Sequence, residues 1–253
     1  MSDFNGWCTE SETPVSPHKL RLLAAVLEKQ PYAIKVVASG IPEYYASPTR
    51  IAGLLKLLGK PAAAKFVEDK LPTTLPIKSG DLGEILCTAY VTEATTFKLG
   101  IKRLRWKDHR NMSMRGEDVL AFSLDPTDGA LIILKAEVKS RAAMTTAVIE
   151  EARSALAGNM EFPSPHAISF VADRLDEAGD WKLRDALDKA QLKEGLKLSQ
   201  ITHMLFTFSG SDPTNLLKKN LSTYAGVVPQ QYIALQVKPH QAFIKAVFNA
   251  VEK

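Results

Sequence analysis

Two short apolar segments separated by a turn constrain the fold of this chain more than any other feature. Residues 119–124 and 130–140 are rich in branched and aromatic side chains. The turn between them reads Asp125-Pro126-Thr127-Asp128-Gly129. Strand-like runs on either side of a turn that contains Gly and Pro predict a β-hairpin.

The register of this hairpin decides which charged side chains meet. If Asp125 and Ala130 close the loop, pairing continues outward one residue at a time, and Asp118 lies opposite Glu137. Directly opposed residues share a face of the sheet, with Cβ atoms ~4.5–5.5 Å apart. Lys139 follows Glu137 by two residues and shares that face as well. A slip of one residue would place the two acids on opposite faces.

Two carboxylates opposed in this way repel each other unless a cation lies between them. A hard divalent cation such as Mg²⁺ prefers carboxylate oxygens and usually keeps water molecules for chemistry. The second strand begins apolar on both faces, which is typical of a central strand, and becomes polar only toward Glu137 and Lys139. Charged groups at the end of a buried strand are costly unless they are paired or functional.

The remaining pattern predicts an α/β protein with a mixed central sheet flanked by helices. Residues 1–78 are predicted to be a helical N-terminal region, and residues 79–253 the main domain. Leu20, Leu22, Leu23, Val26 and Leu27 recur at helical spacing. Ser47-Pro48 and Pro61 begin two further helices, and Pro72 to Pro76 form an extended connector.

After the connector, a helix is predicted with Ser79 or Asp81 as its cap. Residues 97–110 are predicted to form a strand and a turn before the hairpin. A helix from Thr145 to Leu156 should follow it and end at Gly158-Asn159. Further helices are expected within 166–175, 180–192 and 240–253, and strands within 202–210 and 231–237.

A cluster of basic residues precedes the hairpin. Between Lys98 and Arg115, seven Lys and Arg residues stand against the single acid Asp108, in a chain whose net charge is only +4. Such a cluster is able to bind phosphates with little reading of sequence, and a tryptophan within it could stack on a base. The alternatives are an edge strand kept soluble by its charges, and a tryptophan that only packs. The candidate nucleic-acid contacts are Lys102, Arg103, Arg105, Trp106, Lys107, Arg115 and Arg141.

The order of acids and lysine resembles the PD-(D/E)xK, or restriction-endonuclease-like, nuclease superfamily. Glu84 in GDLGE precedes Asp118 in RGEDVLAF, and Glu137 and Lys139 follow in LKAEVKS. The resemblance implies catalysis by Asp118, Glu137 and Lys139, with Lys139 positioning the attacking water. It also implies Mg²⁺, or alternatively Mn²⁺, held by Asp118, Glu137, the carbonyl of Val138 and Glu84. Glu117 stands where many relatives have proline, and the roles of Glu84 and Glu117 remain open alternatives.

Within that superfamily, the helical N-terminal portion and residues 102–122 and 131–141 resemble HamA, the nuclease subunits of Hachiman anti-phage systems. That resemblance implies a Mg²⁺-dependent phosphodiesterase acting on DNA, with a HamB-like helicase as partner. Two alternatives remain: a non-catalytic DNA-binding or helicase-docking scaffold of the same fold, and a repair or restriction nuclease.

Composition excludes several other classes of protein. With 253 residues, 45% hydrophobic and 24% charged, the chain has ordinary globular composition. Its two cysteines, Cys8 and Cys87, suit neither a zinc site nor a disulfide framework. The polar N-terminus and short apolar runs predict a cytoplasmic protein without a membrane segment. Neither a GxGxxG nor a GxSxG motif is present, which leaves dinucleotide binding and serine hydrolysis without support.

Overall fold

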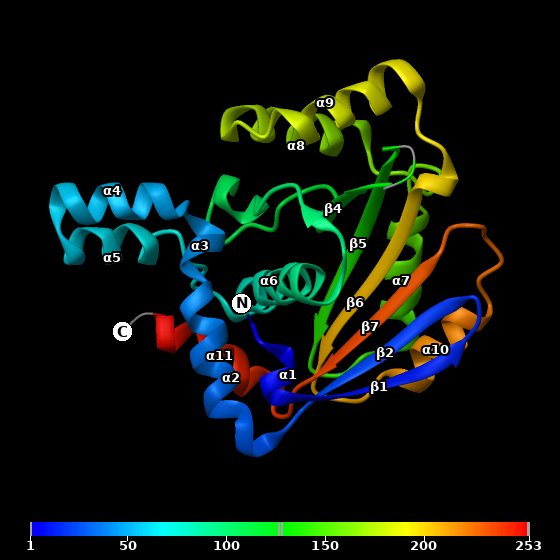
Figure 1. Cartoon of the computed structure of the whole chain (residues 1–253). Helices are drawn as coiled ribbons and strands as arrows, with labels where there is room; N and C mark the ends of the chain where they lie inside the picture. Colours follow the sequence, from blue (N-terminus) through cyan, green and yellow to red (C-terminus); the bar gives the residue numbers. More distant parts are fainter. Residues whose placement is uncertain (1, 126, 128, 252–253) are drawn as a thin grey trace.

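A seven-stranded mixed sheet forms the centre of the molecule in the computed structural model, which describes residues 2–125, 127 and 129–251 (Figure 1). The strand order is β1-β2-β7-β6-β5-β4-β3. The four strands β2, β7, β6 and β5 run parallel to one another, and antiparallel pairs complete both edges. The strands are β1 (Cys8–Val15), β2 (His18–Ala25), β3 (Lys98–Leu99), β4 (Val119–Leu124), β5 (Leu131–Arg141), β6 (Ile201–Ser209) and β7 (Gln230–Gln236).

Helices cover both faces of this sheet, as predicted for an α/β protein. The α-helices are α1 (Phe4–Trp7), α2 (Gln30–Gly40), α3 (Pro42–Tyr45), α4 (Pro48–Leu58), α5 (Lys60–Glu68), α6 (Leu75–Ala94), α7 (Thr146–Ala157), α8 (Pro165–Ala178), α9 (Trp181–Lys189), α10 (Thr214–Ser222) and α11 (His240–Val251). Shorter helical turns are η1 (Leu27–Lys29), η2 (Arg103–Trp106), η3 (Ala190–Glu194) and η4 (Leu198–Gln200).

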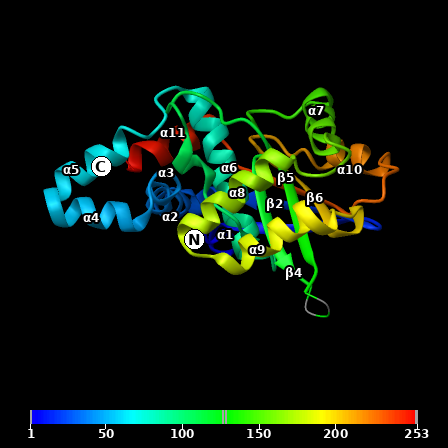
Figure 2. The ribbon, with the colours of Figure 1, turned by 90° about the horizontal axis from the view of Figure 1, so that it is seen from above.

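Seen from above, α6, α11 and α2 lie on one face of the sheet, and α7 and α10 lie on the other (Figure 2). Helix α8 packs on the same face as α7, against the loop end of the β4–β5 hairpin, where Ile168 and Val171 contact Phe122 and Ile133. The two faces therefore meet different helices along β5. The carboxyl end of β5 lies between α6 and α7.

The N-terminal region is not wholly helical, so the prediction of a helix through Leu20 to Leu27 was wrong. Residues His18–Ala25 form β2, which pairs with β7 and lies one strand in from the edge. Leu20 is buried against the α7 and α10 face, whereas Leu23 is buried against the α6 face. Because both faces of this strand are covered, its sequence lacks the alternation of apolar and polar residues that is typical of a strand. Its continuous apolar run therefore also fits helical spacing. The boundary after residue 78 stays a prediction.

Helix α6 begins earlier than predicted, which shortens the expected connector and removes the proposed caps. Thr74 is its N-cap residue, and Pro76 lies in its first turn, a position that suits proline. The structure buries every residue from Asp81 to Val91, so this segment is surrounded by protein. Burial on all sides places Glu84 inside the molecule.

The predicted beginning of α4 and end of α7 are confirmed, whereas residues 97–110 and helix α10 differ from the prediction. Ser47 caps α4 through the backbone N–H of Arg50, and Thr145 caps α7 before Gly158 ends it. Residues 97–110 form only the two-residue β3 and the turn η2. Helix α10 was missed. Pro126 and Asp128 of the predicted hairpin turn lie outside the described residues.

Lys135 stabilises the junction between β5 and the end of α7. Its Nζ atom donates to the carbonyls of Leu156, Gly158 and Phe162 at 2.9–3.0 Å, and the residue is 4% exposed. A cation at a helix C-terminus is favourable, and here it satisfies carbonyls that the helix itself leaves open.

We predict that Lys135→Met lowers the free energy of unfolding by about 2 kcal/mol or more, because buried carbonyls lose their donor. Urea denaturation measures this, with Lys98→Met on the exposed edge strand β3 as the control. Equal stability of the two variants would contradict the assignment.

Candidate active site

The β4–β5 hairpin has the register that the turn sequence predicts. Val119 pairs with Ala136, and Leu124 pairs with Leu131 at the loop end. The pairing ends at Val119 and Ala136, and Asp118 lies directly before β4, next to that pair. One oxygen of Asp118, Oδ2, accepts the backbone N–H of Val138 at 2.8 Å, which holds the carboxylate against the edge of β5.

Glu137 and Lys139 form an ion pair on the face of β5 that α7 covers. The Lys139 Nζ atom lies 3.0 Å from Glu137 Oε1 and 2.8 Å from Glu151 Oε1 on α7. Burial, and next the charge of Asp118, raise the pKa of Glu137 to about 7 despite the lysine. Burial lowers the pKa of Lys139, but Glu151 and Glu137 outweigh it, so that pKa lies above its usual value.

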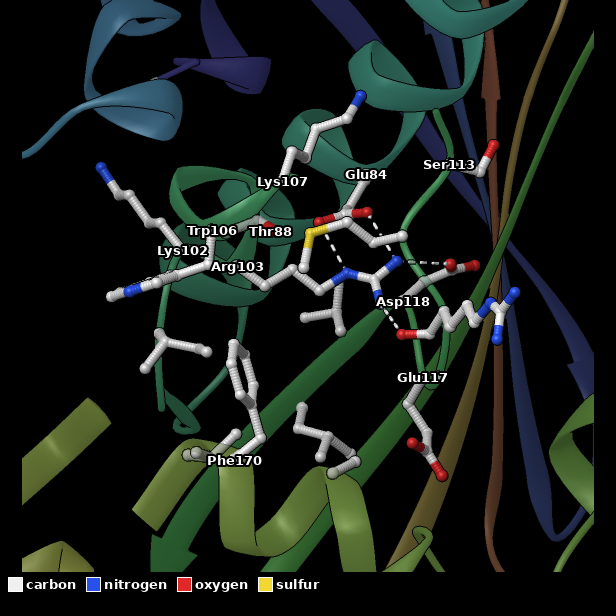
Figure 3. Close-up of a pocket in the computed structure, with 18 of the residues that line it drawn as sticks. Glu84, Thr88, Lys102, Arg103, Trp106, Lys107, Ser113, Glu117, Asp118 and Phe170 are labelled. Carbon is white, nitrogen blue, oxygen red and sulfur yellow. Dashed lines mark hydrogen bonds and ion pairs between the residues drawn. The ribbon is translucent and has the colours of Figure 1, made fainter. Parts of the chain in front are cut away.

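Glu84 reaches the same region from α6 and meets a buried arginine. Arg103 donates from Nε to Glu84 Oε1 at 3.0 Å and from Nη2 to Glu84 Oε2 at 2.9 Å. The same Nη2 atom donates to Asp118 Oδ1 at 3.0 Å, so the guanidinium lies between the two carboxylates (Figure 3). Burial raises the pKa of Glu84 to about 7, against the lowering effect of Arg103.

The short edge strand explains how Arg103 gains this position. Strand β3 ends at Leu99, which pairs with Ala121, and the last contact with β4 is the Gly100 N–H on the carbonyl of Leu120, so the chain leaves β4 close to its first residue. The chain then turns through η2 and places Arg103 beside the beginning of β4. Its Nη1 atom also donates to the carbonyl of Arg115 at 3.3 Å.

The donors in this region suit a hard divalent cation, although they are not yet gathered around one point. Among the described residues, no three His, Cys, Asp or Glu side chains form a group positioned to hold a metal. The charge of Asp118 nevertheless reaches Glu137, whose pKa it helps to raise after burial. Carboxylate oxygens with excess negative charge are what Mg²⁺ or Mn²⁺ requires. The contribution of the Val138 carbonyl stays a prediction.

A cavity of about 400 Å³ opens beside Arg103 and brings part of the basic cluster together. Trp106 forms one wall with Phe170, in edge-to-face contact at 6.1 Å between ring centroids. Glu84 and Asp118 lie on its lining. The predicted nucleic-acid contacts on its lining are Lys102, Arg103, Trp106, Lys107 and Arg115.

Several members of the basic cluster already have protein partners. Lys107 Nζ lies 2.7 Å from Asp81 and is almost fully buried, and Lys102 pairs with Glu43 at 2.9 Å. Arg105, which does not line this cavity, donates from Nε to the carbonyl of Glu43 at 2.9 Å.

Two arginines of the predicted set remain exposed. Arg115 is exposed at the rim of the cavity. Arg141 does not line the cavity. It lies at the exposed end of β5, where it donates to the carbonyl of Ser140. Their exposure makes these two side chains the most accessible to a phosphate.

Glu117 has a structural contact that the sequence did not reveal. Its carboxylate accepts the backbone N–H and the hydroxyl of Ser164, the N-cap residue of α8. Glu84, by contrast, shares its arginine with Asp118. Of the two open alternatives, Glu84 is therefore the acid that lies in the carboxylate cluster.

Comparisons with known proteins place the chain in a family. The HamA family model matches residues 2–251. The chain belongs to the HamA family. It is 26% identical over 260 residues to the Hachiman protein HamA of Bacillus cereus, a match that covers 99% of this chain and 91% of that protein. The family resemblance predicted from the sequence is confirmed.

Family membership alone assigns no role to a side chain, so the chemistry of the site has to be argued from its residues. Sequence reasoning missed the ion pairs of Arg103 with Glu84 and Asp118, and of Lys107 with Asp81.

Within the part of the chain that is described, no helix has both the length and the apolar character needed to cross a membrane.

We predict a pH dependence of stability that follows from the carboxyl at position 137. Its folded pKa of about 7 exceeds the usual 4.5, so the native state retains a proton that the unfolded chain has lost. Stability should therefore fall as the pH rises from about 4.5 to 7, by up to about 1.4 kcal/mol per pH unit.

Glu137→Gln should reduce this slope in urea denaturation across the same pH range, and the raised pKa of Glu84 accounts for the slope that remains. Glu151→Gln is the matched control, because Glu151 contacts the same lysine but its pKa is lowered by that contact. An unchanged slope in Glu137→Gln would show that this carboxyl titrates normally.

Proposed function

We propose that this HamA-family chain is a metal-dependent DNA nuclease of restriction-endonuclease-like fold, the effector of a Hachiman-type defence complex. The observation that carries the proposal is the β4–β5 register. It sets Asp118 directly before the Val119–Ala136 pair, one residue from Glu137 on β5, where Lys139 pairs with Glu137. Two acids and a lysine at the end of a central strand would be a costly arrangement without a function.

Phosphodiester hydrolysis needs a nucleophilic water and stabilisation of charge on the phosphate oxygens. A divalent cation held by Asp118 and Glu137 would lower the pKa of a bound water and neutralise developing negative charge. Lys139 donates from a partly buried position, 12% exposed, where its charge acts more strongly than in bulk water. We assign Lys139 the task of orienting the attacking water, and Glu151 that of holding the lysine in place.

DNA is the proposed substrate because exposed cations lie on two sides of the acids. Arg115 is at the rim of the cavity and Arg141 at the exposed end of β5. Contacts of this kind bind the backbone without reading its sequence, which suits an enzyme that destroys invading DNA in the cytoplasm. A HamB-like helicase is the proposed partner, since the chain shares its full length with a Hachiman protein.

A specific observation keeps a second candidate function in view. Arg103 pairs with both Glu84 and Asp118, and acids held in this way also fit a DNA-binding or helicase-docking scaffold. A repair or restriction nuclease with the same residues would differ in its partner rather than in its chemistry. Cleavage assays separate the first alternative, and the identity of the co-purified protein separates the second.

We predict that replacing Glu137 and Lys139 together by alanine abolishes Mg²⁺-dependent plasmid cleavage, a loss of at least about 100-fold, because the metal ligand and the water-orienting cation are both removed. The assay uses the chain co-purified with its partner, with ATP and DNA ends supplied, in Mg²⁺ and in EDTA. Lys135→Ala is no suitable control, since it disturbs α7; Lys218→Ala on the exposed surface of α10 is suitable. Undiminished cleavage by a folded double variant contradicts the assignment.

We also predict that Arg115→Ala weakens DNA binding and lowers the slope of log affinity against log salt by about 1, as expected for one lost phosphate contact. Fluorescence anisotropy at several salt concentrations measures both quantities, with Lys218→Ala as the charge-matched control. Identical slopes for wild type and Arg115→Ala would remove Arg115 from the DNA-binding surface.

A further inference from the structure

The guanidinium of Arg103 uses carboxylate oxygens that a metal ion would need. It engages both oxygens of Glu84 and Oδ1 of Asp118 at 2.9–3.0 Å. The remaining oxygen of Asp118, Oδ2, accepts the N–H of Val138. Every carboxylate oxygen of this pair thus has a protein partner, and Arg103 provides three of the four contacts.

Burial makes these contacts strong and mutually dependent. The side chains of Arg103 and Glu84 are 12% and 11% exposed, and that of Asp118 is 24% exposed. Removing a cation from such a pair leaves uncompensated buried charge, which is strongly unfavourable. Arg103 therefore leaves Glu84 and Asp118 only when another cation replaces it and another anion receives it.

The cavity beside Arg103 offers a place where such an anion could be received. Arg103 itself lines this space of about 400 Å³, together with the exposed Arg115 and the aromatic wall of Trp106 and Phe170. Nη1 of Arg103 already contacts a carbonyl of the segment that carries Arg115. A guanidinium binds phosphate through two parallel hydrogen bonds, much as it binds carboxylate, so the exchange preserves its bonding geometry.

We propose that Arg103 is a positioning residue that holds Glu84 and Asp118 in the DNA-free protein and transfers to a strand phosphate in the cavity when the divalent metal binds. The inference rests on the proposed function and adds to it a coupling between metal and substrate. The carboxylates become available to metal only where a phosphodiester is present. Nuclease chemistry is thereby tied to an occupied strand-binding cavity.

The coupling is tested by Mn²⁺ affinity rather than by cleavage. Electron paramagnetic resonance counts free Mn²⁺ during titration of the full chain, with and without a short phosphorothioate oligothymidylate that resists hydrolysis. We expect the oligonucleotide to tighten Mn²⁺ binding to wild type by about 10-fold, within the usual range of coupling between two sites. Arg103→Gln should bind Mn²⁺ about 10-fold more tightly than wild type without the strand, and the strand should change its affinity far less.

Arg153→Gln is the matched control, because Arg153 is also a buried, ion-paired arginine, 14% exposed, but its partner is Glu161. It should behave as wild type. If Arg103→Gln does not fold, the wild-type coupling and the Arg103→Lys variant carry the test. Lysine cannot form the bidentate contact with Glu84, so Arg103→Lys should give a Mn²⁺ affinity between those of wild type and Arg103→Gln.

Three outcomes separate this inference from the proposed function. Unchanged Mn²⁺ affinity in Arg103→Gln, or no effect of the strand on wild type, overturns the exchange. If the Glu137 and Lys139 double variant nevertheless loses cleavage, the nuclease assignment stands without it. Absence of Mn²⁺ binding to every variant, with the strand present, overturns both.

Discussion

The balance of buried charge at the carboxyl end of β5 is the constraint on which the rest of the site depends. Glu84 on α6, Asp118 just before β4 and Glu137 on β5 all lie in this region, and each would be unfavourable there alone. Arg103 compensates the first two, and Lys139 the third. Three of the four carboxylate oxygens of Glu84 and Asp118 are bound by the side chain of Arg103, which can change partner, and only Asp118 Oδ2 is bound by the backbone.

The hairpin register determines this balance. A shift of one residue between β4 and β5 would turn the side chains of the shifted strand to the opposite faces and separate Asp118 from Glu137. Lys135, on the same face as Glu137, anchors the end of α7, and Glu117 anchors the beginning of α8. The charged residues around the acids thus fall into two groups. Lys135 and Glu117 hold the helices that surround the site, whereas Arg103 and Lys139 compensate the charge of its carboxylates.

The hairpin and its register could be predicted from sequence because a short turn and a period of two specify them locally. Strand β2 could not, since Leu20 and Leu23 are buried on opposite faces and their spacing imitates a helix. The acids and the lysine of the candidate site could be named from the sequence because they lie on or beside elements with clear periodicity. The acids that Arg103 binds could not be predicted, because the contact depends on β3 being only two residues long, and no periodic pattern in the sequence indicates that length. The sequence identified Arg103 as a cation, but only the fold shows that it binds the acids instead of facing outward.

The central claim is that Asp118 and Glu137 jointly hold a divalent metal beside Lys139. A crystal structure of the full chain with Mn²⁺ and a phosphorothioate strand, with anomalous scattering used to locate manganese, tests it most directly. The account predicts a manganese peak within coordination distance of oxygens from both Asp118 and Glu137, with the guanidinium of Arg103 on a strand phosphate. A peak bound elsewhere, with Arg103 still between Glu84 and Asp118, would contradict it.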